Sequence, residues 1–165
     1  GVQGNSFLET FDRKYVKDAL DSLAKFKLPI RITEFNIPGM RSALKNVQLT
    51  QEQEIARAKE TVDFYRLCFA HPAVEGIIMW GFWEGANWVP SSSMYKRDWT
   101  STPTAEAYHN LVYNEWWTKE SGIAGKKGVY SVPAFYGKYR ITVNGISKEV
   151  DLTKAEGKIT VDFKR

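Results

Sequence analysis

Two periods of hydrophobic spacing divide the chain. Before about residue 120, apolar residues recur every three or four positions in three segments, a short β-branched run lies between the first two, and residues 75–82 form a near-continuous apolar run. The periodic segments predict helices, and the near-continuous run is typical of a strand buried on both faces. The expected helices cover residues 12–27, 50–70 and 103–116, and the expected strands cover 28–35 and 75–82. Strands that alternate with helices predict an α/β layer with parallel strands.

After Gly122 the hydrophobic period changes to two. Apolar residues alternate with polar ones on both sides of Asn144-Gly145, a dipeptide that favours a tight hairpin turn. The pattern predicts a small antiparallel sheet over residues 124–165. The chain is therefore expected to have an α/β part, residues 1–122, followed by an antiparallel β-sheet appendage, residues 123–165.

Composition narrows the possible functions. The 165 residues are 43% hydrophobic and 14% aromatic, enough to build a core, and the net charge of +4 comes from bases scattered among acids. Without a basic stripe we expect no nucleic-acid partner, and without a run of roughly 18 apolar residues we expect no membrane span. His71, His109 and the single Cys68 lack metal-ligand spacing, so no metal and no cofactor are expected.

Two acids stand at the ends of the two expected strands. Glu34 comes directly after a β-branched run, and Glu84 follows soon after Trp80. Paired carboxylates suit cleavage of a glycosidic bond, in which one stabilises or attacks the anomeric carbon and the other protonates the leaving oxygen. An ion pair with a neighbouring arginine is an equally good explanation of either acid from the pattern alone.

The segment from Trp80 to Trp88 gathers three tryptophans around two glycines and an asparagine. Aromatic faces stack on the apolar faces of sugar rings, while amides and carboxylates bind the hydroxyl groups. The segment therefore favours a carbohydrate cleft. The alternative is a packed core cluster, which is plausible for Trp83 and is the better explanation for Trp116 and Trp117 on the third helix.

Four blocks of the chain resemble glycoside hydrolase family ten, the endo-β-1,4-xylanases. They are GVQG at residues 1–4, LPIRITE at 28–34, HPAVEGI at 71–77 leading to WGFW at 80–83, and AYHN at 107–110. The resemblance covers about residues 1–120. It implies the carboxyl-terminal part of a (β/α)8 TIM barrel, strands six to eight, with the β-rich tail as an appendage.

The resemblance also implies roles for individual residues. Glu34 matches the catalytic nucleophile of a retaining mechanism, while Asn5 and Asn36 stand where relatives carry a histidine and an acid that hold the nucleophile ionised. They would be a paired neutral replacement. The implied substrate-binding residues are Gln3, Asn5, Trp80, Glu84 and Trp88, with Asn36 supporting the nucleophile.

The implied function is a retaining endo-β-1,4-xylanase that acts on xylan or xylo-oligosaccharides and is secreted or bound at the cell surface. The family's acid/base glutamate lies on the fourth barrel strand, and no residue here matches it. We therefore expect the amino-terminal part of the barrel to act as a complementing polypeptide. A non-catalytic carbohydrate-binding protein, and a hydrolase of another β-linked glucan, are the alternatives.

Overall fold

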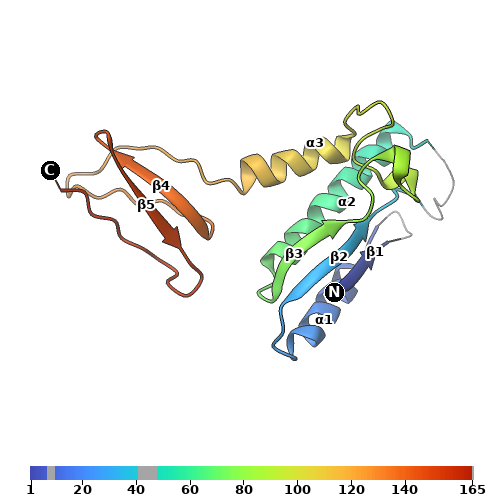
Figure 1. The fold of residues 1–165 in the computed structure, drawn as a ribbon, viewed down its shortest axis with the longest axis horizontal. Helices are drawn as coiled ribbons and strands as arrows, with labels where there is room; N and C mark the ends of the chain where they lie inside the picture. The colour runs from blue at the N-terminus through green and yellow to red at the C-terminus, as the bar shows by residue number, and fades with distance from the viewer. Residues whose placement is uncertain (7–9, 41–47, 165) are drawn as a thin grey trace. The chain divides into compact units, whose positions relative to one another are not determined.

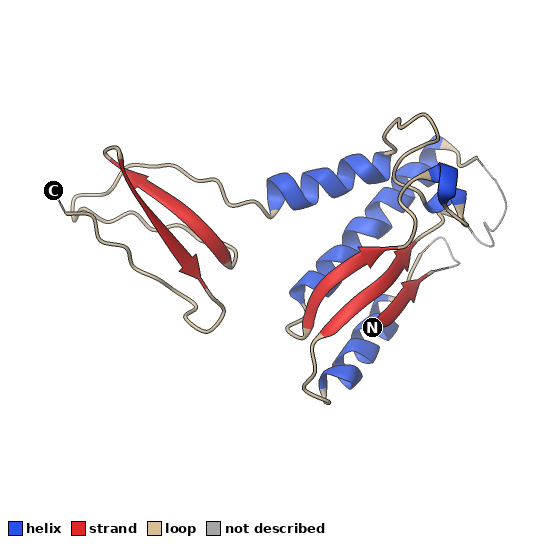
Figure 2. Cartoon of the chain, viewed as in Figure 1, coloured by secondary structure: helices blue, strands red, loops and turns tan. Residues whose placement is uncertain are grey.

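The computed structural model describes residues 1–6, 10–40 and 48–164. They form two compact units, Gly1–Leu111 and Val112–Arg165, which we call the α/β unit and the hairpin unit. The elements are labelled in Figure 1 and coloured by type in Figure 2. In chain order they are β1 (Val2–Asn5), α1 (Arg13–Ala24), β2 (Ile30–Asn36), α2 (Gln51–Ala70), β3 (Val74–Met79), two 3-10 turns (Glu84–Ala86 and Pro90–Ser92), α3 (Pro103–Asn110), a π-helical turn (Leu111–Glu115), β4 (Gly137–Val143) and β5 (Ile146–Leu152).

The α/β unit is built on a three-stranded parallel sheet in the order β1-β2-β3, as the alternating pattern predicts. Helices α1 and α2 lie behind the sheet in Figure 1, and the core forms between them. Phe35 of β2 stacks on Phe64 of α2 with ring centroids 4.2 Å apart, and Phe11 meets the edge of the same ring. Tyr65 joins α3 to this core by an edge contact with Tyr108.

The two faces of the sheet are not equally covered, which corrects the expectation that the strand over residues 75–82 is buried on both faces. Ile30 and Ile32 of β2 are buried, whereas Arg31 is exposed and Ile78 of β3 is 54% exposed. The described helices cover one face only, so apolar side chains on the opposite face remain open within the described residues.

A register shift in β2 sets which side chains face the cavity described below. The pairing of β2 with β3 is irregular between Ile32 and Phe35. Phe35 stacks on the Phe64 ring, and the Ile32 side chain and the Phe64 ring both lie close to Gly4. Strict alternation would place residues three apart on opposite faces, so the irregularity lets Phe35 pack inward and turns Glu34 away from the helices.

Helix boundaries follow local capping signals. The Thr50 hydroxyl accepts from the Gln53 backbone N–H and the Gln53 side chain accepts from the Thr50 N–H, which confirms the expected capping box at the start of α2. Thr102 caps α3 one residue before Pro103. Beyond α3 the chain continues as a π-helical turn to Glu115, close to the predicted helix end.

The hairpin unit contains a smaller sheet than the alternation predicted. Among its described residues only β4 and β5 pair, in antiparallel register from Gly137 with Leu152 to Val143 with Ile146. Asn144 and Gly145 have φ values of 49° and 82°, which suits the expected tight turn. The sheet prediction is wrong for the described residues outside 137–152, because alternation alone supplies no strand partner, and Ile159 and Val161 lie outside any strand.

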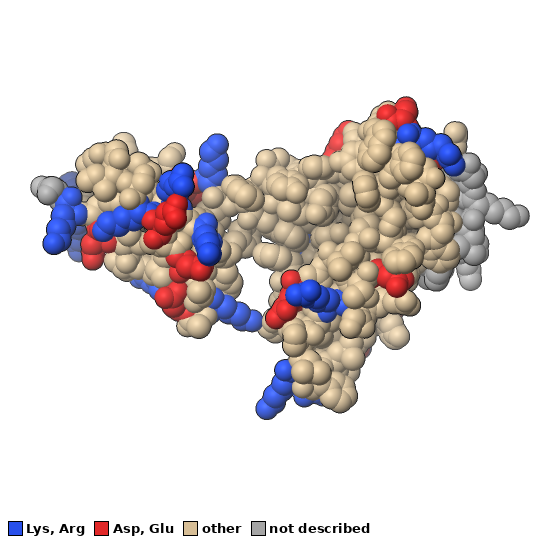
Figure 3. Space-filling model, viewed as in Figure 1, with Lys and Arg blue, Asp and Glu red and all other residues tan. Residues whose placement is uncertain are grey.

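The charged side chains are mixed on the surface as they are along the sequence. Lys and Arg side chains are interspersed with Asp and Glu on both units in the face shown in Figure 3. In the part of the chain that the structure describes, no helix is long and apolar enough to cross a membrane, and no group of three or more His, Cys, Asp or Glu side chains is placed to hold a metal ion.

Candidate active site

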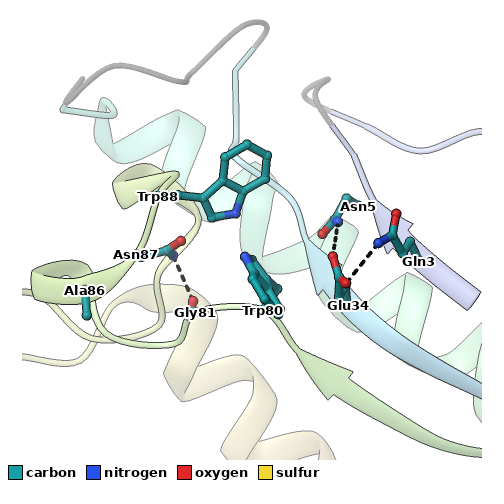
Figure 4. Close-up of a pocket in the computed structure, with 8 residues that line it drawn as sticks. All are labelled: Gln3, Asn5, Glu34, Trp80, Gly81, Ala86, Asn87 and Trp88. Carbon is teal, nitrogen blue, oxygen red and sulfur yellow. Dashed lines mark hydrogen bonds between the residues drawn. The ribbon is translucent and has the colours of Figure 1, made fainter. Parts of the chain in front are cut away.

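A cavity of about 780 Å³ opens at the carboxyl ends of the parallel strands, where TIM-barrel enzymes place their active sites. We call it the strand-end cavity (Figure 4). It brings together five of the residues that the sequence nominated, from β1, β2 and the segment after β3. Its lining residues are Gln3, Asn5, Glu34, Trp80, Gly81, Ala86, Asn87 and Trp88.

The carboxylate of Glu34 is held by two side-chain amides from β1. Gln3 donates from Nε2 to Oε1 at 2.9 Å, and Asn5 donates from Nδ2 to Oε2 at 3.1 Å. The β1–β2 pairing places Gln3 directly opposite Glu34, which explains the first contact. Each carboxylate oxygen thus has one donor that fixes its direction and keeps further lone pairs for a ligand. The ion pairs found between described residues use other carboxylates than Glu34, so the arginine-pair explanation finds no support here.

Trp80 and Trp88 form an aromatic side of the cavity and face the Glu34 side in Figure 4. Each is 47% exposed, so the rings are open to a ligand rather than packed in the core. The Trp80 backbone N–H donates to the Phe35 carbonyl at 2.9 Å, which extends the β2–β3 pairing and places the Trp80 side chain beside the end of β2. The core-cluster alternative therefore does not describe these two tryptophans.

Asn87 shapes the loop that carries Trp88. We call residues 80–102 the tryptophan loop. The Asn87 Nδ2 donates to the Gly81 carbonyl and to the Ser93 hydroxyl, both at 2.8 Å, and its Oδ1 accepts from the Val89 N–H at 3.1 Å. Gly81 has φ +74° and a Cβ there would lie 2.6 Å from Asn87 Cγ, so the turn needs glycine. The sequence signal for this anchor was the asparagine inside the tryptophan-rich segment, but its site role was not predicted.

A buried arginine holds the tryptophan loop to the helices. Arg57 of α2 is 1% exposed, pairs with Glu54 at 2.7 Å, and donates to the Ser93 carbonyl and to the Thr102 hydroxyl. Burial lowers the pKa of the Arg57 guanidinium, and Glu54 acts in the opposite direction. Arg57 was not predicted as a residue of the site, because no neighbouring residue indicates that its side chain is buried.

Asn36 is 1% exposed, and neither its Nδ2 nor its Oδ1 has a hydrogen-bond partner among the described residues. It pairs with Asn5 across the β1–β2 register, so the two amide residues are neighbours. Of the two, Asn5 contacts Glu34. Support of the nucleophile by Asn36 stays a prediction.

Glu84 lies outside the strand-end cavity. It begins a 3-10 turn, and its Oε2 accepts the Arg97 backbone N–H at 3.0 Å, which closes the far side of the tryptophan loop. No described residue brings it toward Glu34, so the structure separates the two acids that the sequence placed together. The described residues offer a single carboxylate in this cavity, and the paired-carboxylate chemistry needs a second one.

Comparison with known proteins identifies the family. The sequence profile of Glycosyl hydrolase family 10 matches residues 1–114. The chain is 38% identical over 144 residues to the anti-sigma-I factor RsgI6 of Acetivibrio thermocellus, a match that covers 87% of this chain and 17% of that protein. It is 27% identical over 177 residues to endo-1,4-beta-xylanase 1 of Arabidopsis thaliana, covering 99% of this chain and 16% of the relative. The chain thus spans about a sixth of the length of these curated relatives.

Solved structures agree with this fold. Xylanase 10B from Thermotoga maritima superposes with a TM-score of 0.56 at 20% identity, over 68% of this chain and 35% of that chain. A xylanase 10C variant from Cellvibrio japonicus in complex with xylopentaose gives 0.56 at 13% identity, over 67% and 26%. The chain belongs to glycosyl hydrolase family 10, and it has the fold of the carboxyl-terminal part of the family's (β/α)8 barrel followed by a small antiparallel β appendage.

Proposed function

We propose that this chain is part of a retaining endo-β-1,4-xylanase in which Glu34 is the catalytic nucleophile. The observation that carries the proposal is the Glu34 carboxylate itself, which is fixed by Gln3 and Asn5 and faces two exposed tryptophans in the strand-end cavity. The exposed indole rings can stack on the apolar faces of a xylose ring. The Glu34 carboxylate, whose direction is fixed by two hydrogen bonds, can attack the anomeric carbon. The substrate class comes from the xylanases among the relatives.

In this mechanism a Glu34 oxygen forms a bond to the anomeric carbon while the bond to the leaving-group oxygen breaks. A second carboxylic acid protonates that oxygen, and the same group later takes a proton from the water that cleaves the glycosyl ester. The two carboxyl groups should lie about 5 to 5.5 Å apart for retention. Gln3 and Asn5 keep the nucleophilic oxygens directed at the cavity throughout.

The second acid must come from outside the described residues of this chain. We propose a complementing polypeptide that supplies the amino-terminal part of the barrel and the acid/base glutamate. In support, the outer edges of β1 and β3 have no strand partner among the described residues, and the uncovered face exposes Ile78. Open edges and an open apolar face favour association with further strands.

Replacing Glu34 tests the catalytic assignment. Glu34→Gln keeps the size and shape of the side chain but removes the nucleophilic charge and replaces one of the two accepting oxygens by an amide donor. We expect a loss of about a thousandfold or more in kcat on xylan in the complemented enzyme, with binding of xylo-oligosaccharides retained. Glu52→Gln, an exposed acid in the first turn of α2, is the matched control and should leave turnover unchanged. Near-normal hydrolysis by Glu34→Gln would refute the assignment.

Gel filtration with analytical unfolding tests the complementation. The 165-residue chain alone should elute as a self-associated species or unfold without cooperativity, and adding the complementing polypeptide should give one defined complex. A stable, cooperatively unfolding monomer would contradict this part of the proposal without affecting the role of Glu34.

A non-catalytic carbohydrate-binding protein is the second candidate. The observation that favours it is the pair Asn5 and Asn36, neutral amides where the family carries a histidine and an acid. Incubating the complemented protein with arabinoxylan separates the candidates, because binding without release of reducing sugar would support the second. A panel of other β-linked glucans tests the substrate class. In line with the family resemblance, we propose a secreted or cell-surface location for the protein.

A further inference from the structure

A second cavity, of about 520 Å³, lies within the hairpin unit, and nothing in the family assignment explains it. Its size falls in the range of about 300–1,000 Å³ that is typical of small-molecule sites. Three aromatic residues line it: Tyr113, Trp117 and Phe135. Trp117 is 62% exposed, Tyr113 is 54% exposed and Phe135 is 39% exposed, so large apolar rings are open to solvent in a concave site.

Hydrogen bonds between distant segments build this cavity. The Phe135 backbone N–H donates to the Thr118 hydroxyl at 3.2 Å, and the Tyr139 hydroxyl donates to the Phe135 carbonyl at 2.6 Å. The Tyr139 hydroxyl also lies 3.1 Å from the Thr118 Oγ1. Tyr139 belongs to β4, so the hairpin holds the Phe135 segment against the residues that follow the π-helical turn. These hydrogen bonds therefore hold together the two backbone segments that carry Trp117 and Phe135.

The π-helical turn itself supplies part of the lining. Leu111–Glu115 has π-helical geometry, and Tyr113, Asn114 and Glu115 of this turn line the cavity. Single π-helical turns are rare and are frequently found at functional sites. Here the turn presents an aromatic ring, an amide and a carboxylate to the cavity from consecutive positions.

The charges around the cavity select the ligand class. Glu115, Glu120 and Lys119 line it together with the amide of Asn114, so acids and a base are mixed. An anionic ligand would face two carboxylates, and a purely apolar ligand would take charged side chains out of water. A neutral polyhydroxylated ligand suits both the rings and the charged groups, because each sugar ring has apolar faces and a rim of hydroxyls.

We propose that the hairpin-unit cavity is a second carbohydrate-binding site, which holds a neutral β-linked pyranose chain against Trp117 and Tyr113. The site shares no lining residue with the strand-end cavity. That the ligand is a neutral sugar is argued from the lining of this cavity, whereas the β-linkage and the choice of xylan as the first probe rest on the proposed function. A binding site of this kind would keep the polysaccharide attached to the protein between cleavage events.

Indole N–H signals give a site-resolved test. In the assembled protein, with only this chain carrying 15N-labelled tryptophan, the signal of Trp117 is assigned by its loss in Trp117→Phe. Titration with xylohexaose should shift the Trp117 signal as well as those of Trp80 and Trp88. In affinity electrophoresis through soluble arabinoxylan, Trp117→Ala should weaken retention about tenfold. Tyr136→Ala, a 59% exposed aromatic of the hairpin unit outside the lining, is the matched control and should leave retention unchanged.

The outcomes separate this proposal from the previous one. Shifts at Trp80 and Trp88 with a static Trp117 signal would overturn the second site and leave the proposed function standing. A shift at Trp117 alone would support the second site and count against sugar binding beside Glu34. A Trp117 signal that moves with protein concentration in the absence of sugar would overturn the proposal in favour of an interface between chains. Circular dichroism of Trp117→Ala checks that lost retention does not reflect lost folding.

Discussion

Two arginine–glutamate pairs, one in each unit, have similar lengths and opposite surroundings. Arg57 and Glu54 lie 2.7 Å apart, and Arg140 and Glu149 lie 2.9 Å apart. The side chain of Arg57 is 1% exposed, whereas that of Arg140 is 71% exposed. Arg57 also donates to Ser93, 36 positions away, while Arg140 reaches the facing residue of its own hairpin.

The difference shows how each unit fixes its shape. In the α/β unit a buried charge ties the tryptophan loop to α2, so the position of Trp88 depends on contacts distant in sequence. In the hairpin unit the register of β4 with β5 already brings Arg140 opposite Glu149, and the pair follows from the fold rather than supporting it. Exposed pairs of this kind contribute little, because water screens the charges.

Replacing each arginine with alanine should give the largest difference in stability between the two units. Arg57→Ala removes the side-chain donor to the Ser93 carbonyl and one of the two donors to the Thr102 hydroxyl, and it leaves Glu54 without its partner. We expect a loss of about 3–5 kcal/mol in the free energy of unfolding of the α/β unit. Arg140→Ala should cost about 0–1 kcal/mol. Urea unfolding followed by tryptophan fluorescence measures both, and equal losses would mean that the buried pair is not a tether.

Two glycines, one in each unit, have similar backbone angles but different surroundings. Gly81 and Gly128 have φ values of +74° and +70°, so alanine is strained at either position, by about 1–2 kcal/mol. At Gly128 nothing lies within 4 Å of an added Cβ, whereas at Gly81 the Asn87 amide lies 2.6 Å away. Gly81→Ala should therefore also displace the Asn87 anchor and weaken xylo-oligosaccharide binding, and Gly128→Ala should not. Calorimetric titration of the two variants checks this, and equal binding would refute the anchor.

The smallest expected effect concerns pH and the contact between α1 and α2. Asp63 lies 2.5 Å from Arg13 and 2.6 Å from Lys59. Burial raises the pKa of the Asp63 carboxyl, but hydrogen bonds from Lys59 and Arg13 outweigh it, and the net pKa is lowered. A lowered folded-state pKa means that this stabilisation is present above the unfolded-state pKa of about 3.9 and is lost as the pH falls through the folded-state value.

Urea midpoints measured from pH 6 down to the onset of acid unfolding test this contribution. Asp63→Asn should unfold at lower urea near neutral pH, and its midpoint should fall less steeply in acid than that of the parent chain. Asp162→Asn, in the hairpin unit, is the control for a general charge effect. Parallel midpoint curves for the parent and Asp63→Asn would contradict the assignment.

The parts of the fold that could be predicted depend on signals only a few residues long. Thr50 and Gln53 marked the start of α2, and Asn144-Gly145 marked the turn of the hairpin. Glu34 was nominated because it follows a β-branched run, and the structure places it at a strand end in a cavity. These features were accessible because caps, turns and strand ends are decided by neighbouring backbone and side-chain atoms.

Predictions from the sequence were wrong or incomplete where a feature depends on a distant part of the chain. Alternation after Gly122 predicted more sheet than forms, because a strand requires a second strand to receive its hydrogen bonds and the pattern names none. Glu84 was named with Glu34 as an acid at a strand end, and the resemblance then placed it in the substrate site and not as the proton donor. In the structure its carboxylate accepts the Arg97 backbone N–H and closes the tryptophan loop. Distance along the chain does not indicate which way a loop turns.

By itself, therefore, the sequence determined the order of elements, their local boundaries and the acid at the end of β2. The tertiary structure decided the register shift that turns Glu34 toward the cavity, the amides of Gln3 and Asn5 that hold it, and the burial of Arg57. The physical reason is separation, since Gln3 and Glu34 are 31 positions apart and meet only because β1 and β2 pair in parallel. No local propensity encodes such a meeting, and only the packed sheet and helices bring these atoms within hydrogen-bond distance.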